Sequence, residues 1–188
     1  MTESGYFDEL YARTDDPWDL ATSSYERRKY ALTIAALPAE HYRRAFEPGC
    51  AIGVLTAQLV RRCDALLAWD GVPRALEQAR QRVVDPRVTF ELARVPSQWP
   101  PGRFDLVLCS ELLYFLAADD RTTFRDRAVQ SLDPGGHLAA VHWRHAFAEA
   151  PSNGDEVHAE LETTPGLEPL VHLVEPDFRL DVWRRVGG

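Results

Sequence analysis

Short apolar runs of β type alternate with helical segments between residues 44 and 142. The β-type runs are Arg44–Glu47, Ala65–Trp69, Val88–Leu92, Phe104–Cys109 and His137–His142. The helical segments between them are Gly53–Arg62, Pro73–Val83 and Asp119–Leu132. Strands that alternate with helices form βαβ units, and right-handed crossovers arrange such units into a doubly wound sheet. This alternation predicts an α/β fold with a mostly parallel sheet.

The two ends of the chain differ from this central region. Ser23 or Ser24 caps a predicted helix over residues 25–37, whereas residues 1–20 have no long apolar period. Near the C-terminus, a weak helical pattern over residues 152–162 precedes two β-type runs. These runs, residues 170–174 and 178–186, predict a hairpin that places antiparallel strands at one edge of the sheet.

Length, charge and cysteine content exclude several classes of protein. The 188 residues suit one domain, and the net charge of −8 disfavours binding to nucleic acid or to an anionic membrane. No apolar run is long enough to span a membrane, and the first residues do not form a secretory signal. Cys50, Cys63 and Cys109 are odd in number and far apart. We therefore expect no disulfide framework, no zinc pair and a cytoplasmic location.

One loop carries most of the functional information. The first β-type run ends in the loop Glu47-Pro48-Gly49-Cys50-Ala51-Ile52-Gly53, and a helical segment follows. Glycines at a strand-to-helix turn let the backbone approach a ligand closely. The spacing is not the G-x-G-x-x-G of dinucleotide-binding proteins, and the Lys-Ser/Thr pair of a phosphate loop is missing. An acid before the glycines suits an ammonium group better than a pyrophosphate.

Polar residues also follow the other strand ends. Asp70 ends the second run, where a carboxylate accepts hydrogen bonds from ribose hydroxyls. Ala93-Arg94-Val95 and Cys109-Ser110-Glu111 follow the third and fourth runs. Ligands bind at the carboxyl ends of strands in open α/β sheets, so four strand ends point to one crevice.

These motifs, taken in order, resemble those of the class I S-adenosylmethionine-dependent methyltransferases. The acid-x-Gly-x-x-x-Gly loop, Asp70, the FDLVLCSELLYF strand and the LDPGGHLAAVHW segment carry the resemblance. More narrowly, DPWDLATSSYERRKYALTIAALP, FEPGCAIGVLT, SELLYFL, HWRH and GDEVHAEL resemble the nodulation-protein-S-like group. That group methylates an amine of an amino-sugar unit in a chitooligosaccharide. The resemblance implies a Rossmann-like αβα fold with seven strands and an antiparallel C-terminal hairpin.

The resemblance also implies how the chain is divided and which residues hold the cofactor. Residues 1–38 would form a lid and helix segment, 44–143 the cofactor-binding core, and 144–188 the acceptor-side helix and hairpin. The glycine loop would face the methionine part of S-adenosylmethionine, Glu47 its amino group and Asp70 its ribose. The residues expected to contact the cofactor are Trp18, Tyr25, Arg28, Glu47, Gly49, Ala51, Gly53, Asp70, Gly71, Val72, Arg94, Val95, Ser110 and Glu111.

The sequence departs from the superfamily pattern at two positions. Ala51 stands where the loop usually has its middle glycine, and we expect cofactor binding to survive this small methyl group. Ala93-Arg94 replaces the usual acid after the third strand. Adenine recognition would then rest on backbone groups and apolar walls.

Methyl transfer from a sulfonium requires the nucleophile, carbon and sulfur in line, so positioning supplies most of the catalysis. His142 or Glu111 would collect the proton of an amine acceptor. The residues expected to contact the acceptor are Tyr114, Trp143, Arg144 and His158. No metal is expected, because the His142-x-x-His145 spacing is a weak metal signal.

Each of these side chains also has an ordinary structural interpretation. His142 is also a candidate core residue, His158 a surface-helix residue, and Trp18 an anchor for the N-terminal segment. Arg27-Arg28-Lys29 suits a solvated helix face, although one of the three could reach the cofactor carboxylate.

Two further functions stay open beside an amine methyltransferase. One is an O-methyltransferase acting on a natural product or metabolite, and the other is a cofactor-binding regulatory subunit without turnover. The glycine spacing disfavours a NAD-dependent oxidoreductase. The net charge and the sequence SELLY after the fourth strand disfavour a nucleic-acid methyltransferase. We expect a small-molecule or oligosaccharide acceptor, and a monomer or homodimer.

Overall fold

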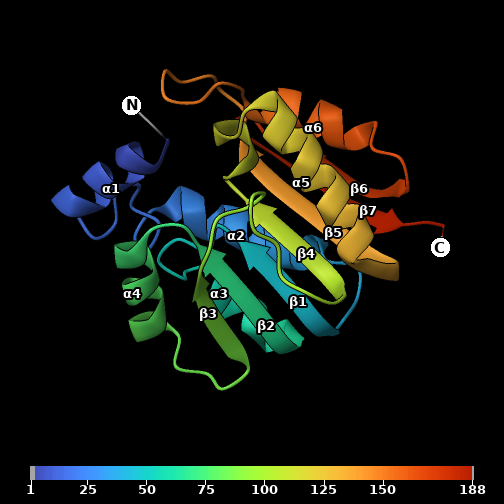
Figure 1. Ribbon diagram of the computed structural model, residues 1–188, viewed down its shortest axis with the longest axis horizontal. Coiled ribbons are helices and arrows are strands. Elements are labelled where there is room, and N and C mark those ends of the chain that lie inside the picture. The colour runs from blue at the N-terminus through green and yellow to red at the C-terminus, as the bar shows by residue number, and fades with distance from the viewer. Residues whose placement is uncertain (1–2, 188) are drawn as a thin grey trace.

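A seven-stranded sheet lies between two layers of helices in the computed structural model, which describes residues 3–187 (Figure 1). The strand order is β3-β2-β1-β4-β5-β7-β6. The parallel strands are β1 (Tyr42–Pro48), β2 (Cys63–Asp70), β3 (Val88–Leu92), β4 (Phe104–Ser110) and β5 (Leu132–Trp143). The strand β7 (Phe178–Arg185) is antiparallel to β5 and to β6 (Leu167–Val174). The expected αβα fold, mostly parallel sheet and C-terminal hairpin are confirmed.

The alternation of side chains along each strand assigns the helices to the two faces of the sheet. In β4, Leu106 and Leu108 pack with α2 (Ser24–Ala36) and α3 (Thr56–Leu59), while Val107 and Cys109 pack on the other face. That other face is covered by α5 (Ala118–Ser131) and α6 (Gly154–Glu162), which lie in front of the sheet in Figure 1. The helix α4 (Pro73–Arg82) packs its Leu76 on Ala68 of β2. Both faces of the central strands are thus buried, as the apolar run in β4 predicts.

Several element boundaries differ from the expected ones. The helix expected over residues 53–62 is a turn followed by α3 and the 3-10 helix η1 (Val60–Arg62), because Gly49, Ala51 and Gly53 all have positive φ. The strand β5 begins at Leu132, so the Asp-Pro-Gly-Gly segment lies within it. A register shift against β4 between Phe104 and Leu106 accommodates the extra residues.

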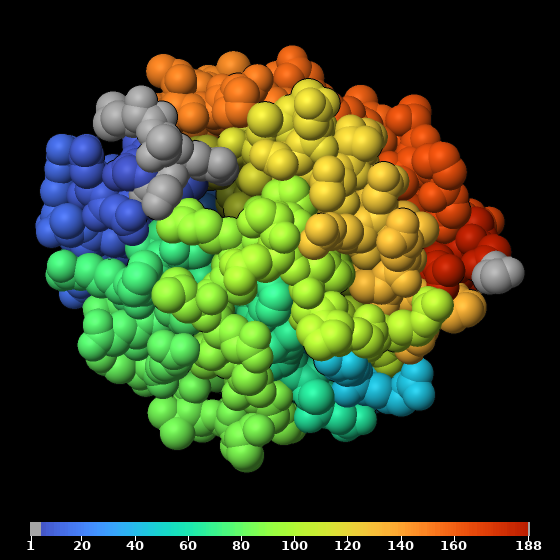
Figure 2. All heavy atoms as spheres, viewed as in Figure 1, coloured from blue at the N-terminus to red at the C-terminus, as the bar shows by residue number. Residues whose placement is uncertain are grey.

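The helix α1 (Glu3–Arg13) was not expected from the sequence. Its buried face is aromatic and short: Tyr11 packs with Ile52, Val72 and Ala75, and Phe7 joins this cluster. In the space-filling view the blue atoms of this segment lie against the green atoms of α4 (Figure 2). None of the helices in residues 3–187 is long and apolar enough to cross a membrane. Residues 1, 2 and 188, which the expected terminal segments include, lie outside the described residues.

Candidate active site

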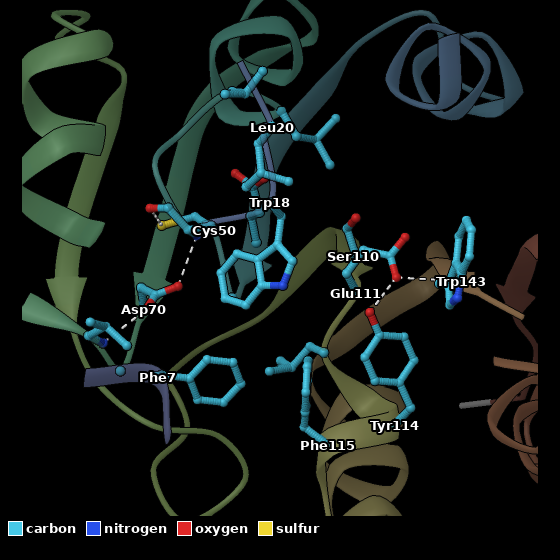
Figure 3. Close-up of a pocket in the computed structure, with 18 of the residues that line it drawn as sticks. Phe7, Trp18, Leu20, Cys50, Asp70, Ser110, Glu111, Tyr114, Phe115 and Trp143 are labelled. Atoms are coloured by element: carbon cyan, nitrogen blue, oxygen red, sulfur yellow. Dashed lines mark hydrogen bonds between the residues drawn. The ribbon is translucent and has the colours of Figure 1, made fainter. Parts of the chain in front are cut away.

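A cavity of about 500 Å³ opens at the carboxyl ends of the parallel strands. Its walls come from the loops after β1, β2, β3 and β4, the end of β5, and residues between 7 and 30. In Figure 3, Asp70 and Cys50 lie on one side, Glu111 and Tyr114 lie on the other, and Trp18 and Phe7 lie between them. Its volume is in the range of small-molecule sites.

The loop after β1 is held against the end of β2 by backbone hydrogen bonds. Gly49 N and Cys50 N both donate to Trp69 O, at 2.8 and 2.9 Å. A Cβ at Gly49 would lie 3.3 Å from Leu112 Cδ2, and the φ of +75° there also favours glycine. Ala51 adopts a φ of 48° and donates its N–H to Asp70 Oδ2 at 2.9 Å. The alanine in place of the usual glycine therefore leaves the loop closed and hydrogen-bonded.

Asp70 is positioned by the backbone on both sides of it. Its Oδ2 accepts from Ala51 N and its Oδ1 from Val72 N at 2.8 Å. Burial raises the pKa of Asp70, although these N–H groups and the charge of Arg94 oppose the rise. Each oxygen keeps a further lone pair, and the residue lines the cavity. This carboxylate suits a pair of vicinal hydroxyls.

Glu47 is only 2% exposed, and its Oε2 has no hydrogen-bond partner among the described residues. Burial, together with the nearby Asp70, raises the pKa of Glu47 to about 8. A buried acceptor without a donor is costly, so this atom fits a ligand that brings a donor such as an ammonium group.

A second polar cluster lies at the other end of the cavity. The buried Lys29 ammonium contacts Glu26 Oε1 at 2.9 Å and Glu111 Oε1 at 2.5 Å. Burial alone would lower the pKa of Lys29, but the two carboxylates raise it above the usual value. Glu111 Oε2 accepts from Tyr114 Oη at 2.6 Å and from Trp143 N at 2.8 Å. Two carboxylates and one ammonium give this end of the cavity a net negative charge.

The aromatic wall of this acidic end also carries an unused polar group. Tyr25 packs edge-on against Trp143, and Lys29 Nζ lies 5.0 Å from the centre of the Tyr25 ring. The Tyr25 hydroxyl and Glu26 Oε2 are buried without a partner among the described residues. A ligand with several N–H or O–H groups would satisfy both atoms.

The N-terminal segment closes the cavity from outside the sheet. Phe7 of α1 packs on Phe115 with ring centres 4.8 Å apart, and Trp18 packs on Phe7 and Tyr11. Trp18 remains 39% exposed. A ligand in the cavity would therefore lie beneath an aromatic cover that contacts both of its ends.

Most of the predicted site residues line this one cavity. They are Trp18, Tyr25, Glu47, Gly49, Ala51, Asp70, Gly71, Val72, Arg94, Val95, Ser110, Glu111, Tyr114 and Trp143.

Three predicted residues instead have structural roles at the edge of the site. Gly53 lies under α4, where a Cβ would be 3.1 Å from Ala79 Cα, so close packing explains this glycine. Arg28 points outward and forms a double hydrogen bond with Glu175. Arg144 pairs with Asp155 and donates to Glu175 O. None of the three contacts the cavity, so their expected ligand-binding roles do not fit the structure.

The two predicted histidines also lie behind the cavity rather than in it. His142 and His158 are fully buried, and their ring nitrogens Nδ1 and Nε2 lie 3.0 Å apart. His142 Nε2 also accepts from Leu113 N, at 3.2 Å. These contacts occupy both nitrogens of His142, so the expected role as direct proton acceptor does not fit its position.

Sequence reasoning missed Glu26 and did not single out Lys29 from Arg27 and Arg28; the structure places Glu26 and Lys29 in the cavity wall. Their neighbours Arg27 and Arg28 are exposed, so the segment resembled a solvated face. One signal was present: Lys29 is the only lysine in a chain with 21 basic residues. Phe7 and Tyr11 were missed together with their helix.

The cavity fits S-adenosylmethionine on three observations made above. The backbone at Gly49 can approach the methionine part of the cofactor closely. Glu47 Oε2, which has no partner among the described residues, suits the cofactor's amino group. Asp70 suits the hydroxyls of its ribose. Gly71 and Val72 would flank the adenosine, with the side chain of Arg94 packed over Gly71.

Comparison with known proteins agrees with this fit. A model of the family described as Nodulation protein S (NodS) matches residues 8–150. Nodulation protein S of Rhizobium tropici is 33% identical over 128 residues, which are 66% of this chain and 53% of that protein. The chain spans about half the length of the first curated relatives that it matches.

Solved structures of methyltransferases also match this chain, over most or nearly all of its length. The N-methyltransferase NodS from Bradyrhizobium japonicum WM9, in complex with S-adenosylhomocysteine, has a TM-score of 0.87 at 26% identity. The match covers 98% of this chain and 99% of that one. A Pseudomonas syringae protein described as a methyltransferase has a TM-score of 0.77 at 48% identity, covering 87% of this chain and 100% of that one.

The chain has the fold of the class I methyltransferases, and its cavity fits their cofactor, S-adenosylmethionine. Within that class, the chain belongs to the nodulation protein S family, whose model covers most of its length.

Proposed function

We propose that this protein methylates an amine of a small-molecule acceptor, and that the acceptor is an amino sugar or an oligosaccharide that carries one. The acidic end of the cavity is the observation that carries this proposal. Glu26, Lys29 and Glu111 together are net negative, which attracts an ammonium and repels a carboxylate. The description of the solved NodS relative as an N-methyltransferase is consistent with it.

The chain's own residues would act by holding the acceptor and taking its proton. S-adenosylmethionine supplies, when bound, a methyl group on a positively charged sulfur. Glu26 Oε2 and the Tyr25 hydroxyl, which no hydrogen bond within residues 3–187 satisfies, would receive hydrogen bonds from the amine and a neighbouring hydroxyl. Glu111 already accepts three hydrogen bonds, so it contributes charge and orientation, and Glu26 is the better proton acceptor.

The aromatic walls suit a sugar ring. Tyr25, Tyr114, Phe147 and Trp143 line the acidic end, and flat apolar faces pack against the C–H faces of sugars. The reacting unit of an oligosaccharide would lie at this end, beside the cofactor, and the rest of the oligosaccharide would lie outside the cavity. The cytoplasmic location and the monomer-or-homodimer state stay predictions, which fractionation and light scattering would check.

The test is an acceptor pair that differs only at nitrogen. Purified protein with S-adenosylmethionine is given a chitooligosaccharide with one free amine, or the same compound fully N-acetylated. We expect S-adenosylhomocysteine and a singly methylated product from the first compound only. Methylation of the N-acetylated compound, or of a carboxylate acceptor in preference to both, would contradict the proposal.

A variant matched in size tests whether the charge of Glu26 carries this effect. Glu26→Gln keeps the size and an oxygen for Lys29 but removes the charge. The Michaelis constant for the amine should rise about tenfold, with S-adenosylhomocysteine affinity unchanged. Glu77→Gln, on the exposed side of α4, is the control and should match the parent.

A further inference from the structure

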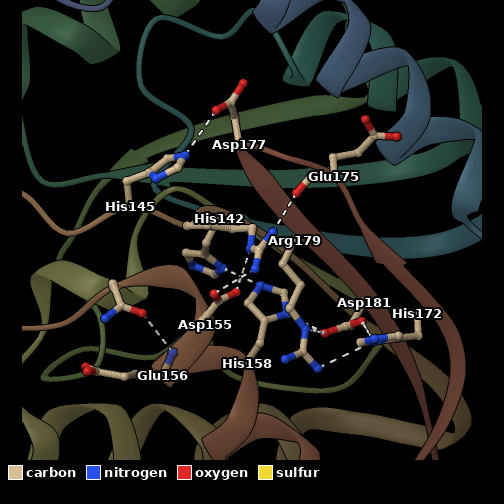
Figure 4. A network of polar contacts seen from close by, with 12 residues as sticks. His142, His145, Asp155, Glu156, His158, His172, Glu175, Asp177, Arg179 and Asp181 are labelled. Carbon is tan, nitrogen blue, oxygen red and sulfur yellow. Dashed lines mark hydrogen bonds and ion pairs between the residues drawn. The ribbon is translucent and has the colours of Figure 1, made fainter.

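A chain of hydrogen bonds runs behind the acidic end of the cavity, from the loop after β4 to β7. Leu113 N donates to His142 Nε2 at 3.2 Å, and His142 Nδ1 lies 3.0 Å from His158 Nε2. His158 Nδ1 lies 2.6 Å from Asp181 Oδ2. Figure 4 shows the two imidazoles and Asp181 in sequence between β5, α6 and β7. We call His142, His158 and Asp181 the relay.

The direction of every hydrogen bond in the relay is fixed. A backbone N–H only donates, so His142 Nε2 carries no proton and its Nδ1–H donates to His158. His158 Nε2 is then bare, and its Nδ1–H donates to Asp181. Each ring is therefore a neutral imidazole in one tautomer. Burial lowers the pKa of both histidines, which agrees with this assignment.

The far end of the relay is anchored by charge. Asp181 is 2% exposed and also accepts from Arg179 Nε and contacts His172 Nδ1, each at 2.6 Å. Burial alone would raise the pKa of Asp181, but His158, Arg179 and His172 lower it. A fixed carboxylate at this end is what selects the Nδ1–H tautomer of His158.

The near end of the relay holds the segment that carries Glu111. Three consecutive residues of β5 bind this segment: Val141 O accepts from Glu111 N, His142 from Leu113 N, and Trp143 N donates to Glu111 Oε2. The middle contact is the only one of the three made through a β5 side chain. Glu111 has a φ of 54°, a conformation that persists only where the surroundings impose it.

We propose that the relay is a positioning device that holds Glu111 and Tyr114 at the acceptor end through the Leu113 amide. We expect its main effect at the acidic end of the cavity, because Glu111 and Tyr114 lie there, whereas Glu47 and Asp70 lie on other loops. The effect of the relay on methylation of an amine rests on the proposed function.

The test is a matched pair at the middle of the relay. His158→Gln keeps one acceptor for His142 and one donor for Asp181, whereas His158→Leu keeps the volume and neither. We expect His158→Leu to raise the Michaelis constant of the amine or lower kcat at least tenfold. The S-adenosylhomocysteine Kd should change less than twofold, and His158→Gln should recover most of the loss. His41→Gln, on an exposed surface pair, is the control.

Two spectroscopic readouts keep the relay testable without turnover. Imidazole nitrogen NMR should find His142 with a bare Nε2 in the parent and in His158→Gln, and a tautomer mixture in His158→Leu. The Leu113 amide should exchange with solvent faster in His158→Leu only. Three results would overturn the proposed role of the relay. They are equal losses of activity in His158→Leu and His158→Gln, a parallel loss of S-adenosylhomocysteine binding, and an unchanged exchange rate of the Leu113 amide in His158→Leu. An inactive parent with these NMR differences intact would overturn the amine function alone.

Discussion

Lys29 and Glu111 form a buried ion pair whose Nζ–Oε1 distance is 2.5 Å, although 82 residues separate them in the chain. Glu26, one helical turn before Lys29, completes the cluster with a contact of 2.9 Å. The pair joins α2, which packs on one face of the sheet, to the residue that follows β4. It therefore links the N-terminal segment to the acidic end of the cavity.

Removing the Lys29 ammonium should be costly to the fold. Lys29→Met leaves Glu26 and Glu111 close together in a site where the lysine side chain is 2% exposed. Breaking a buried pair costs about 3–5 kcal/mol. Denaturant unfolding should give a loss of this size, whereas Arg27→Met, at an exposed neighbour, should stay close to the parent. A loss below about 1 kcal/mol would mean that the cluster is solvated.

The stability of the folded chain should depend on Glu47 with a defined sign. The folded pKa of about 8 exceeds the ordinary 4.5, so the folded chain binds the extra proton. Stability is then fully present at low pH and falls as the pH rises from about 4.5 to about 8. Glu47→Gln should raise Tm, and by more at about pH 9 than at about pH 5. A Tm difference that is constant across this range would contradict the raised pKa.

The same residue should couple cofactor binding to a proton. An ammonium beside Glu47 favours its ionised form, so S-adenosylhomocysteine should bind more tightly as the pH rises toward about 8. Calorimetry near pH 7 in buffers of different ionisation enthalpy should detect close to one proton released. Glu47→Gln should bind more weakly and release none.

Asp70 should be the main polar determinant of cofactor affinity. Asp70→Ala removes the expected ribose contact and leaves Ala51 N and Val72 N without their acceptor. S-adenosylhomocysteine affinity should fall about tenfold to a hundredfold, the loss expected for charged hydrogen bonds. Titration calorimetry measures this directly. Asp64→Ala, 66% exposed on the same strand, should bind like the parent.

Two substitutions in the glycine loop should have opposite effects. Ala51→Gly relieves a left-handed alanine but adds freedom to the unfolded chain, so stability should rise by at most about 1 kcal/mol. Cofactor binding should persist. Gly53→Ala places a methyl group against Ala79 at a φ of +77° and should cost about 1–3 kcal/mol. Thermal unfolding of both variants, each with and without S-adenosylhomocysteine, checks this pair.

The local sequence pattern was sufficient to predict the sheet and the part of the cavity that contains the glycine loop and Asp70. The apolar run in β4 and the glycine loop between Glu47 and Gly53 are readable without the fold, because strand period and turn chemistry depend on neighbouring residues. Asp70 follows from the rule that ligands bind at strand ends. The sequence did not predict the helix α1, because its packing depends on a few aromatic side chains, chiefly Phe7 and Tyr11.

The acidic end of the cavity was decided by the tertiary structure. Nothing near Lys29 in the chain distinguishes it from the exposed Arg27 and Arg28, and its partner Glu111 arrives from β4. His142 has the right strand-end position for a catalytic base, yet the packing of α6 brings His158 against it and buries both rings. The sequence by itself determined the strands, most of the helices, the glycine loop and the strand-end acids, because local interactions encode them. Pairings between distant residues were decided only when the helices packed on the sheet, because burial and hydrogen-bond partners depend on which faces meet.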